Sequence, residues 1–245
     1  MFFEHQGGYS VVTSEQSHHT TSSVSLPTSL KEVATHELRR RIFAGHLRPG
    51  VKIDQDALAA ELGISKLPIR EAVSALEGEG FINIAPRRGA YVASLSPDDI
   101  RDQYWMLGEI SGLAAERAAQ NLSETDFSTL QQLATAMESC ESDDEQEQLH
   151  FEFHRVINIA AKSSRLTSVL RVLGSSIPRG FAEFDAASAE LTHREHRKIL
   201  KLLKTGKGSQ ARVAVEDHFA RQAEQTVAML TERGFWGLDP GSWTR

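Results

Sequence analysis

Cysteine is nearly absent from this chain of 245 residues, which contains only Cys140. An internal disulfide is therefore excluded, and the composition fits a reducing cytoplasm, where we expect the protein to reside. No apolar run approaches the roughly 18 residues that are needed to span a bilayer, so we expect no membrane association. The N-terminus also lacks the charged and then apolar pattern of a signal peptide.

The chain lacks an excess of positive charge: it has 27 Lys and Arg against 33 Asp and Glu, so the net charge is -6. Taken alone, this value argues weakly against nucleic-acid binding. The charge is unevenly distributed, however: residues 28–93 have a balance of +2 and residues 94–245 a balance of -6. This asymmetry indicates a small, mildly basic module joined to a larger acidic one.

Hydrophobic periodicity divides the chain into four parts. Residues 1–27 are rich in Ser, Thr, His and Gln without periodicity, and we expect a disordered arm. Residues 28–93 predict a winged helix–turn–helix, residues 96–233 an all-α helical bundle, and residues 234–245 a tail, so the expected fold class is mostly α. In the bundle we expect helices at 99–121, 124–139, 144–161, 163–176, 178–187, 190–205 and 208–232.

The stretch Leu62–Phe81 reads LGISKLPIREAVSALEGEGF and predicts a helix with cationic side chains at its start. Ser65 is a good N-cap, and Pro68 is tolerated in the first turn, where its missing N–H loses no hydrogen bond. Apolar residues then recur at helical spacing, which leaves Lys66 and Arg70 on the polar side. A polar, cationic helix start on an apolar base is what a helix that reads the major groove needs.

Two helices precede this segment, and a strand–turn–strand pattern follows it. The turn APRRG contains Arg87, Arg88 and Gly89. Arginines at the start of the third helix and at the wing tip occupy the two places that would reach a duplex, and their planar side chains suit guanine or phosphate. The alternative is a small helical domain that serves only dimer contacts.

The segment IFAGHLRPGVKIDQDALAAELGISKLPIREAVSALEGEGFINIAPRRGAYV resembles the winged helix of the GntR family of bacterial repressors. The resemblance implies operator contacts from the start of the third helix and from the wing. The candidate DNA-binding residues are Ser65, Lys66, Pro68, Arg70, Arg87, Arg88 and Gly89.

Two positions depart from the family pattern. The residue at Lys66 is usually arginine, so the charge is kept and the fork geometry is lost. Some family members contact DNA through an arginine in the second helix, and the matching residue here is Asp56. A carboxylate repels phosphate, so we expect that contact to be absent.

Four histidines fall on three expected helices of the bundle. His150 and His154 are four residues apart and share one helix face, while His196 and His218 lie further along the chain. Histidines on amphipathic helices are usually surface residues or satisfied core residues, and this spacing is not diagnostic of metal binding. Spacing alone therefore leaves a shared metal site and ordinary packing both open. A fifth residue, His193, is expected to be exposed.

The segments FEFHRVINIAAKSSRL, EHRKILKLL and VEDHFARQ resemble the effector domain of the FadR subfamily, usually called FCD. Many FCD domains bind a divalent metal through one Asp and three His, which the resemblance maps onto His154, His196 and His218. His150 stands at the Asp position. In one alternative His150 replaces the Asp as a metal ligand, which gives an all-nitrogen set that suits Zn or Ni. In the other, His150 does not bind the metal, and three histidine ligands remain with a carboxylate such as Glu147 behind His150.

The resemblance also suggests a small organic acid as effector, since a carboxylate could occupy open metal positions. Family members often place an arginine for this ligand in the first effector helix, where this chain has Leu107. The candidates in its place are Arg165, Arg171 and Arg179.

We therefore predict a ligand-responsive regulator, in the first instance a repressor, that binds a palindromic operator in double-stranded DNA as a homodimer. A direct metal sensor is the main alternative. An enzyme is less favoured, because no general base or nucleophile motif accompanies the histidines. Glu152 and Glu195 flank histidines but are expected to lie off the ligand stripe.

Overall fold

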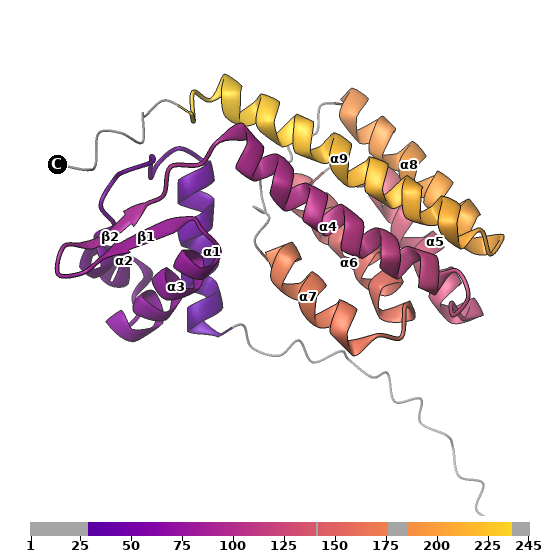
Figure 1. Ribbon diagram of the computed structural model, residues 1–245, viewed down its shortest axis with the longest axis horizontal. Coiled ribbons are helices and arrows are strands. Elements are labelled where there is room, and N and C mark those ends of the chain that lie inside the picture. The colour runs from indigo at the N-terminus through magenta and orange to yellow at the C-terminus, as the bar shows by residue number, and fades with distance from the viewer. Residues whose placement is uncertain (1–28, 141, 176–185, 237–245) are drawn as a thin grey trace, which may run out of the picture.

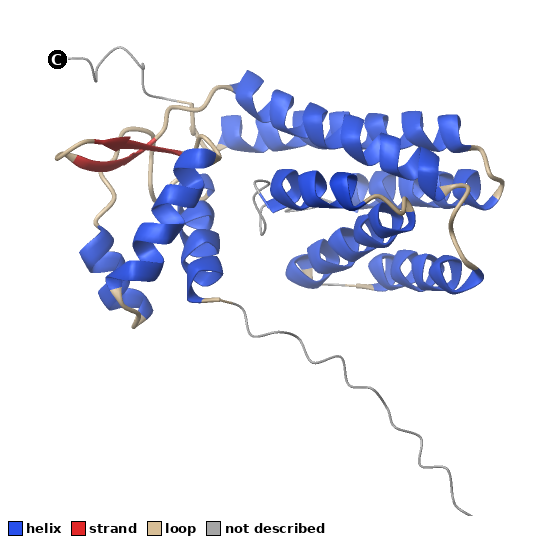
Figure 2. Ribbon diagram, turned by 60° about the horizontal axis from the view of Figure 1, so that its bottom comes forward, coloured by secondary structure: helices blue, strands red, loops and turns tan. Residues whose placement is uncertain are grey.

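The computed structural model describes residues 29–140, 142–175 and 186–236. These residues form an N-terminal winged-helix unit and a helical bundle, joined by the segment before helix α4 (Figure 1). Figure 2 shows that strands occur only in the N-terminal unit of the part drawn in colour. Within that part, no helix combines the length and the apolar character that crossing a bilayer requires.

The winged-helix unit contains three helices and one hairpin. The helices are α1 (Leu30–Phe43), α2 (Gln55–Leu62) and α3 (Lys66–Gly78), and the strands are β1 (Ile82–Ala85) and β2 (Gly89–Val92). The strands are antiparallel, with Ile82 opposite Val92 and Ala85 opposite Gly89. The turn that joins them points away from the bundle (Figure 1).

Local sequence signals account for the ends of α2 and α3. Asp54 accepts hydrogen bonds from the backbone N–H groups of residues 56 and 57, and Gly63 ends α2 with φ +65°, which glycine adopts without strain. Ser65 occupies the N-cap position of α3, yet within the described residues its side chain makes no capping hydrogen bond. Pro68 is the third residue of α3, in the first turn as expected.

The bundle contains six described helices: α4 (Pro97–Ala118), α5 (Glu124–Ser139), α6 (Asp143–Ala160), α7 (Ser164–Ser175), α8 (Ala186–Lys204) and α9 (Gly208–Glu232). Capping boxes start α4 at Ser96 with Asp99 and α5 at Ser123 with Asp126. The expected helix at 178–187 lies largely outside the described residues, and residues 186 and 187 already belong to α8.

Helices α4 and α9 pack side by side along the bundle (Figure 1). Glycines on α4 permit this close approach, because a Cβ at Gly108 would lie 3.3 Å from the Phe219 Cβ, and a Cβ at Gly112 would lie 2.9 Å from the Glu216 Cγ. Tyr104 of α4 is also buried against α9, and its hydroxyl lies 3.0 Å from the hydroxyl of Thr226.

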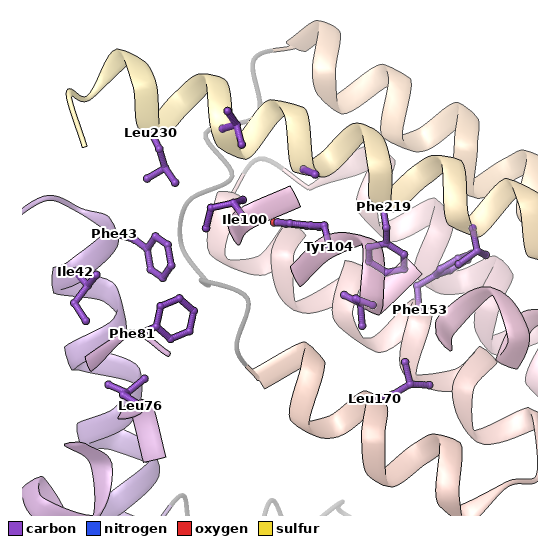
Figure 3. Close-up of a cluster of buried hydrophobic side chains, with 14 of the residues drawn as sticks. Ile42, Phe43, Leu76, Phe81, Ile100, Tyr104, Phe153, Leu170, Phe219 and Leu230 are labelled. Carbon is purple, nitrogen blue, oxygen red and sulfur yellow. The ribbon is translucent and has the colours of Figure 1, made fainter. Parts of the chain in front are cut away.

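The hydrophobic core is continuous between the two units. Figure 3 shows Phe43 and Phe81 of the winged helix on one side and Ile100 and Tyr104 of α4 on the other. Phe235, which follows α9, is also buried, and its ring stacks on that of Phe43 with centroids 6.0 Å apart and planes 10° apart. Residues 235 and 236 thus pack against the body of the protein, although we had assigned them to the tail.

We predict that Phe235→Ala destabilises the protein by about 3 kcal/mol, because it removes a buried ring that both units share. Urea unfolding of the full chain measures the effect, with Val213→Ala, an exposed position on α9, as the control. A loss below about 1 kcal/mol would show that the aromatic contact does not hold the two units together.

Candidate metal centre and nucleic-acid interface

The start of α3 and the wing tip present exposed cationic side chains. Lys66 and Arg70 are exposed on α3, and Arg87 and Arg88 are exposed in the β1–β2 turn. Arg87 has φ +64°, an αL conformation that directs the turn. These four residues lie where the sequence placed them, and their contact with DNA stays a prediction.

Gly89 has a structural reason for being glycine. Its φ is +115°, and a Cβ there would lie 2.9 Å from the Cε of Lys52. The side chain of Lys52 therefore lies against the turn end of the wing, and Lys52 also forms a β-bridge to Tyr91. Sequence reasoning did not identify this additional cation, because Lys52 stands in the loop before α2, outside both segments that were expected to reach DNA.

The four histidines of the bundle converge. His150 and His154 come from α6, His196 from α8 and His218 from α9. One ring nitrogen of each lies within 4.8 Å of the others, which makes the group a candidate metal site. Because Zn–N bonds are about 2.0–2.1 Å long, the nitrogens of a tetrahedral site lie roughly 3.3–3.4 Å apart. Two pairs in the group, at 3.0 and 3.3 Å, are already close to that separation. We call these four residues the histidine cluster.

Not every ring nitrogen of the histidine cluster has a hydrogen-bond partner among the described residues. The Nε2 atom of His218 lies 3.0 Å from that of His150 and 3.3 Å from that of His154. His196 is 1% exposed, and among the described residues neither of its ring nitrogens has a hydrogen-bond partner. A buried polar atom without a partner is costly and calls for an explanation, and a bound cation would supply one. The donor set therefore fits a divalent metal.

The surroundings keep the imidazoles neutral, which is the form that binds a metal. Burial lowers the pKa of His150 to about 3, with a smaller contribution from His218. Burial likewise lowers the pKa values of His154 and His196 well below their usual range. Burial also lowers the pKa of His218, although the hydrogen bond to Glu195 opposes this change.

Glu195 orients His218, which corrects our expectation that it lies off the ligand stripe. Its Oε2 atom accepts from the Nδ1 atom of His218 at 2.7 Å, so that the Nε2 atom faces the histidine cluster. The Nε atom of Arg221 donates to the other oxygen of Glu195, also at 2.7 Å. Burial raises the pKa of Glu195, but the bonds from His218 and Arg221 outweigh it and hold the pKa at about 2. The carboxylate is thus ionised behind the ligand.

His193 is buried, so the expectation that it is exposed was wrong. Its Nε2 atom lies 3.0 Å from the side-chain nitrogen of Gln146 in a buried pair between α8 and α6. The adjacent Thr192 is also buried, and its hydroxyl accepts from Arg221. Helical periodicity placed His193 off the ligand face correctly, but it could not reveal that a second helix covers this face.

Two of the three candidate effector arginines are on the solvent-exposed surface of the bundle. Arg165 and Arg171 are exposed on α7, and Arg179 lies outside the described residues. Arg221 is the arginine that the structure places behind the cluster, and its side chain is largely buried. Sequence reasoning missed Arg221, although its spacing of three residues from His218 on one helix was a usable signal.

Two family models match the chain. The model described as "Bacterial regulatory proteins, gntR family" matches residues 30–92, and the model described as "FCD domain" matches residues 102–221. The first match covers the winged helix, and the second includes all four residues of the histidine cluster.

Similar proteins are transcriptional regulators and not enzymes. The uncharacterised HTH-type regulator YdhC of Bacillus subtilis (strain 168) is 27% identical, over 80% of this chain and 91% of its own. The HTH-type transcriptional repressor RspR of Escherichia coli (strain K12) is 27% identical over 81% and 90%. The Nta operon transcriptional regulator of Aminobacter aminovorans is 28% identical over 76% and 89%.

Solved structures support the fold. E. coli McbR/YncC matches with a TM-score of 0.64 at 21% identity, over 84% of this chain and 99% of that one. A putative transcriptional regulator GntR from Rhodococcus sp. RHA1 matches with a TM-score of 0.58 at 18% identity, over 81% and 97%. At these identities the likeness concerns the fold alone.

We predict that His196→Leu stabilises the metal-free protein. The change removes two buried nitrogens without partners and keeps an apolar contact with Phe153, whose ring lies 4.5 Å from that of His196. Each unsatisfied buried group costs about 1–3 kcal/mol, so the gain should be at least about 1 kcal/mol in chelator-treated samples.

The same variant should not respond to metal. Thermal unfolding with and without Zn²⁺ should show stabilisation of the wild type alone, with the exposed His46→Leu variant behaving like the wild type. If chelator-treated His196→Leu is less stable than chelator-treated wild type, the ring of His196 is needed for packing and the interpretation fails.

Proposed function

Because the chain belongs to the GntR family of bacterial regulatory proteins and carries an FCD domain, we propose that it is a ligand-responsive transcriptional repressor in the cytoplasm. It binds a palindromic operator as a homodimer, and a small carboxylic acid modulates the binding at a metal-containing pocket. The similar protein RspR is an HTH-type transcriptional repressor, which supports repression as the direction of regulation.

The exposed cations of α3 and the wing support the DNA-binding part of the proposal. The start of α3 would enter the major groove, where Lys66 and Arg70 reach base edges or flanking phosphates. The wing would bring Arg88 to the neighbouring groove, with Gly89 allowing the backbone to come close. Two copies related by a twofold axis would read two half-sites of a short palindrome.

Apolar side chains left exposed on the bundle support the homodimer. Trp105 and Met106 on α4 and Val172 on α7 are all more than one-third exposed. Large apolar groups exposed on two helices that contact each other are suited to burial in an interface. The dimer would therefore form through the bundle and leave the winged helices to meet DNA.

One observation carries the metal-dependent part: four imidazoles, three of them buried, face one another, and His196 has no hydrogen-bond partner among the described residues. All four donors are nitrogens, a set that suits Zn or Ni. A metal bound there would offer a coordination position to the carboxylate of an effector. Glu195 would keep the Nε2 atom of His218 aimed at the ion.

Helix α9 supports a route from this pocket to the winged helix. It carries His218 in the histidine cluster, and the segment after its end brings Phe235 against Phe43 of α1. A ligand that shifts α9 would therefore change the position or freedom of the DNA-binding unit, which is the differential contact that regulation requires.

A direct metal sensor is the second candidate function, and the all-histidine donor set favours it. Operator binding by the full-length protein tests both functions. The protein is compared after treatment with a chelator, after loading with Zn²⁺ or Ni²⁺, and after loading in the presence of a panel of small carboxylic acids. A change on loading alone identifies a metal sensor, and a change that needs an acid identifies an effector-responsive repressor. The absence of specific DNA binding in every state would contradict the proposal.

Glu195→Gln should weaken metal binding about 10- to 100-fold, since the neutral amide no longer fixes the tautomer of His218 as firmly. Competition with a coloured chelator measures the affinity. Glu152→Gln on α6, whose carboxylate pairs with Arg155 on the surface, is the matched control. Equal metal affinities of the two variants would show that Glu195 does not support the metal site.

Arg70→Ala should weaken specific operator binding about tenfold or more, the cost of one lost base contact, and leave folding and dimerisation intact. Arg165→Ala, which removes the same charge from exposed α7, should have no effect.

DNA binding by the wild type should also depend steeply on salt. With about six phosphates neutralised, log K should fall with log salt at a slope near -5. Unchanged affinity of Arg70→Ala at fixed salt, or a flat salt titration of the wild type, would contradict this assignment.

A further inference from the structure

An exposed ion pair joins the starts of α2 and α3. The Nζ atom of Lys66 donates to the Oδ2 atom of Asp56 at 2.8 Å. The two side chains are 65% and 69% exposed, so the pair contributes little to the stability of the fold. Lys66 is the first residue of α3, the helix proposed to enter the major groove, so the pair stands where DNA recognition would take place.

A carboxylate at this surface cannot bind the DNA backbone, because phosphate carries the same charge. Only groups that donate hydrogen bonds can satisfy Asp56 on a duplex. In the major groove these are the exocyclic amines of cytosine and adenine, N4 and N6. An acidic residue beside the start of α3 therefore either reads a base or opposes binding.

The pair as a whole matches one base-pair edge. It presents an ammonium donor and a carboxylate acceptor side by side, 2.8 Å apart. A G·C pair presents the complementary arrangement, because the guanine O6 acceptor and the cytosine N4 donor are hydrogen-bonded to each other, roughly 3 Å apart. In an A·T pair the single donor, adenine N6, stands between the acceptors adenine N7 and thymine O4. Guanine N7 lies next to O6, so only the G·C pair gives the ammonium two adjacent acceptors beside the donor that the carboxylate needs.

We propose that Asp56 and Lys66 form a single reading unit that selects a G·C pair at one position of each operator half-site, with Lys66 donating to guanine and Asp56 accepting from cytosine N4. This inference rests on the proposed DNA-binding function. It makes Asp56 a specificity-determining residue. The sequence alone predicts no DNA contact at this position, because a carboxylate repels phosphate.

Selection from a library of double-stranded DNA with a randomised segment tests the proposal on the full-length protein. The wild type should select a motif with one strongly preferred G·C pair per half-site. Asp56→Ala and Lys66→Ala should each reduce the preference for G·C over A·T at that same position about tenfold, and the double variant should lose no more. Preferences at the other positions should be unchanged.

Glu61→Ala is the matched control, because it removes the same charge from the other end of α2, where Glu61 pairs with Arg41 of α1. It should leave the selected motif unaltered. If Asp56→Ala keeps the wild-type motif and binds every sequence more tightly, Asp56 merely masks Lys66, and the inference is overturned while the proposed function stands. If the wild type selects no motif, the proposed function itself fails.

Discussion

The close contact between α4 and α9 is the constraint on which the other parts of the structure depend. Small residues at Gly108 and Gly112 let the two helices approach until side chains of α9 occupy the space that a Cβ would need. This contact fixes the axis of α9, and with it the position of His218 at one level and of Phe235 beyond the helix end. The histidine cluster and the contact with the winged helix are therefore positioned by one rigid element.

The histidine cluster is costly to the stability of the metal-free fold. Four imidazoles are held together in the bundle, where burial keeps them neutral and where His196 has no hydrogen-bond partner in the described part of the chain. Apolar residues would pack there at lower cost. Arg221 holds the carboxylate of Glu195 beside His218, and the hydrogen bond between this carboxylate and the Nδ1 atom limits the ring to one orientation. Such an arrangement is understandable when the cluster has a cation to hold.

In the winged helix, by contrast, the candidate DNA-binding cations are kept in solvent. Its apolar base is closed by Phe43 and Phe81, whose rings meet edge to face at 5.3 Å, while Arg70 and Arg88 remain exposed. Because Phe235 from beyond α9 completes this base, the unit that presents the cations is packed against the unit that contains the histidine cluster.

The sequence by itself determined the features that depend on near neighbours in the chain. The caps of α2 and α4, the ends of most helices, the three-helix order with a wing, and the pairing of His150 with His154 on one face all follow from spacing within a few residues. Only the tertiary structure decided which faces meet. It brought His150 into the cluster, turned Glu195 toward His218 and covered His193 with α6. Helical period gives the direction of a side chain around its own axis, but the partner it meets depends on how the helices pack.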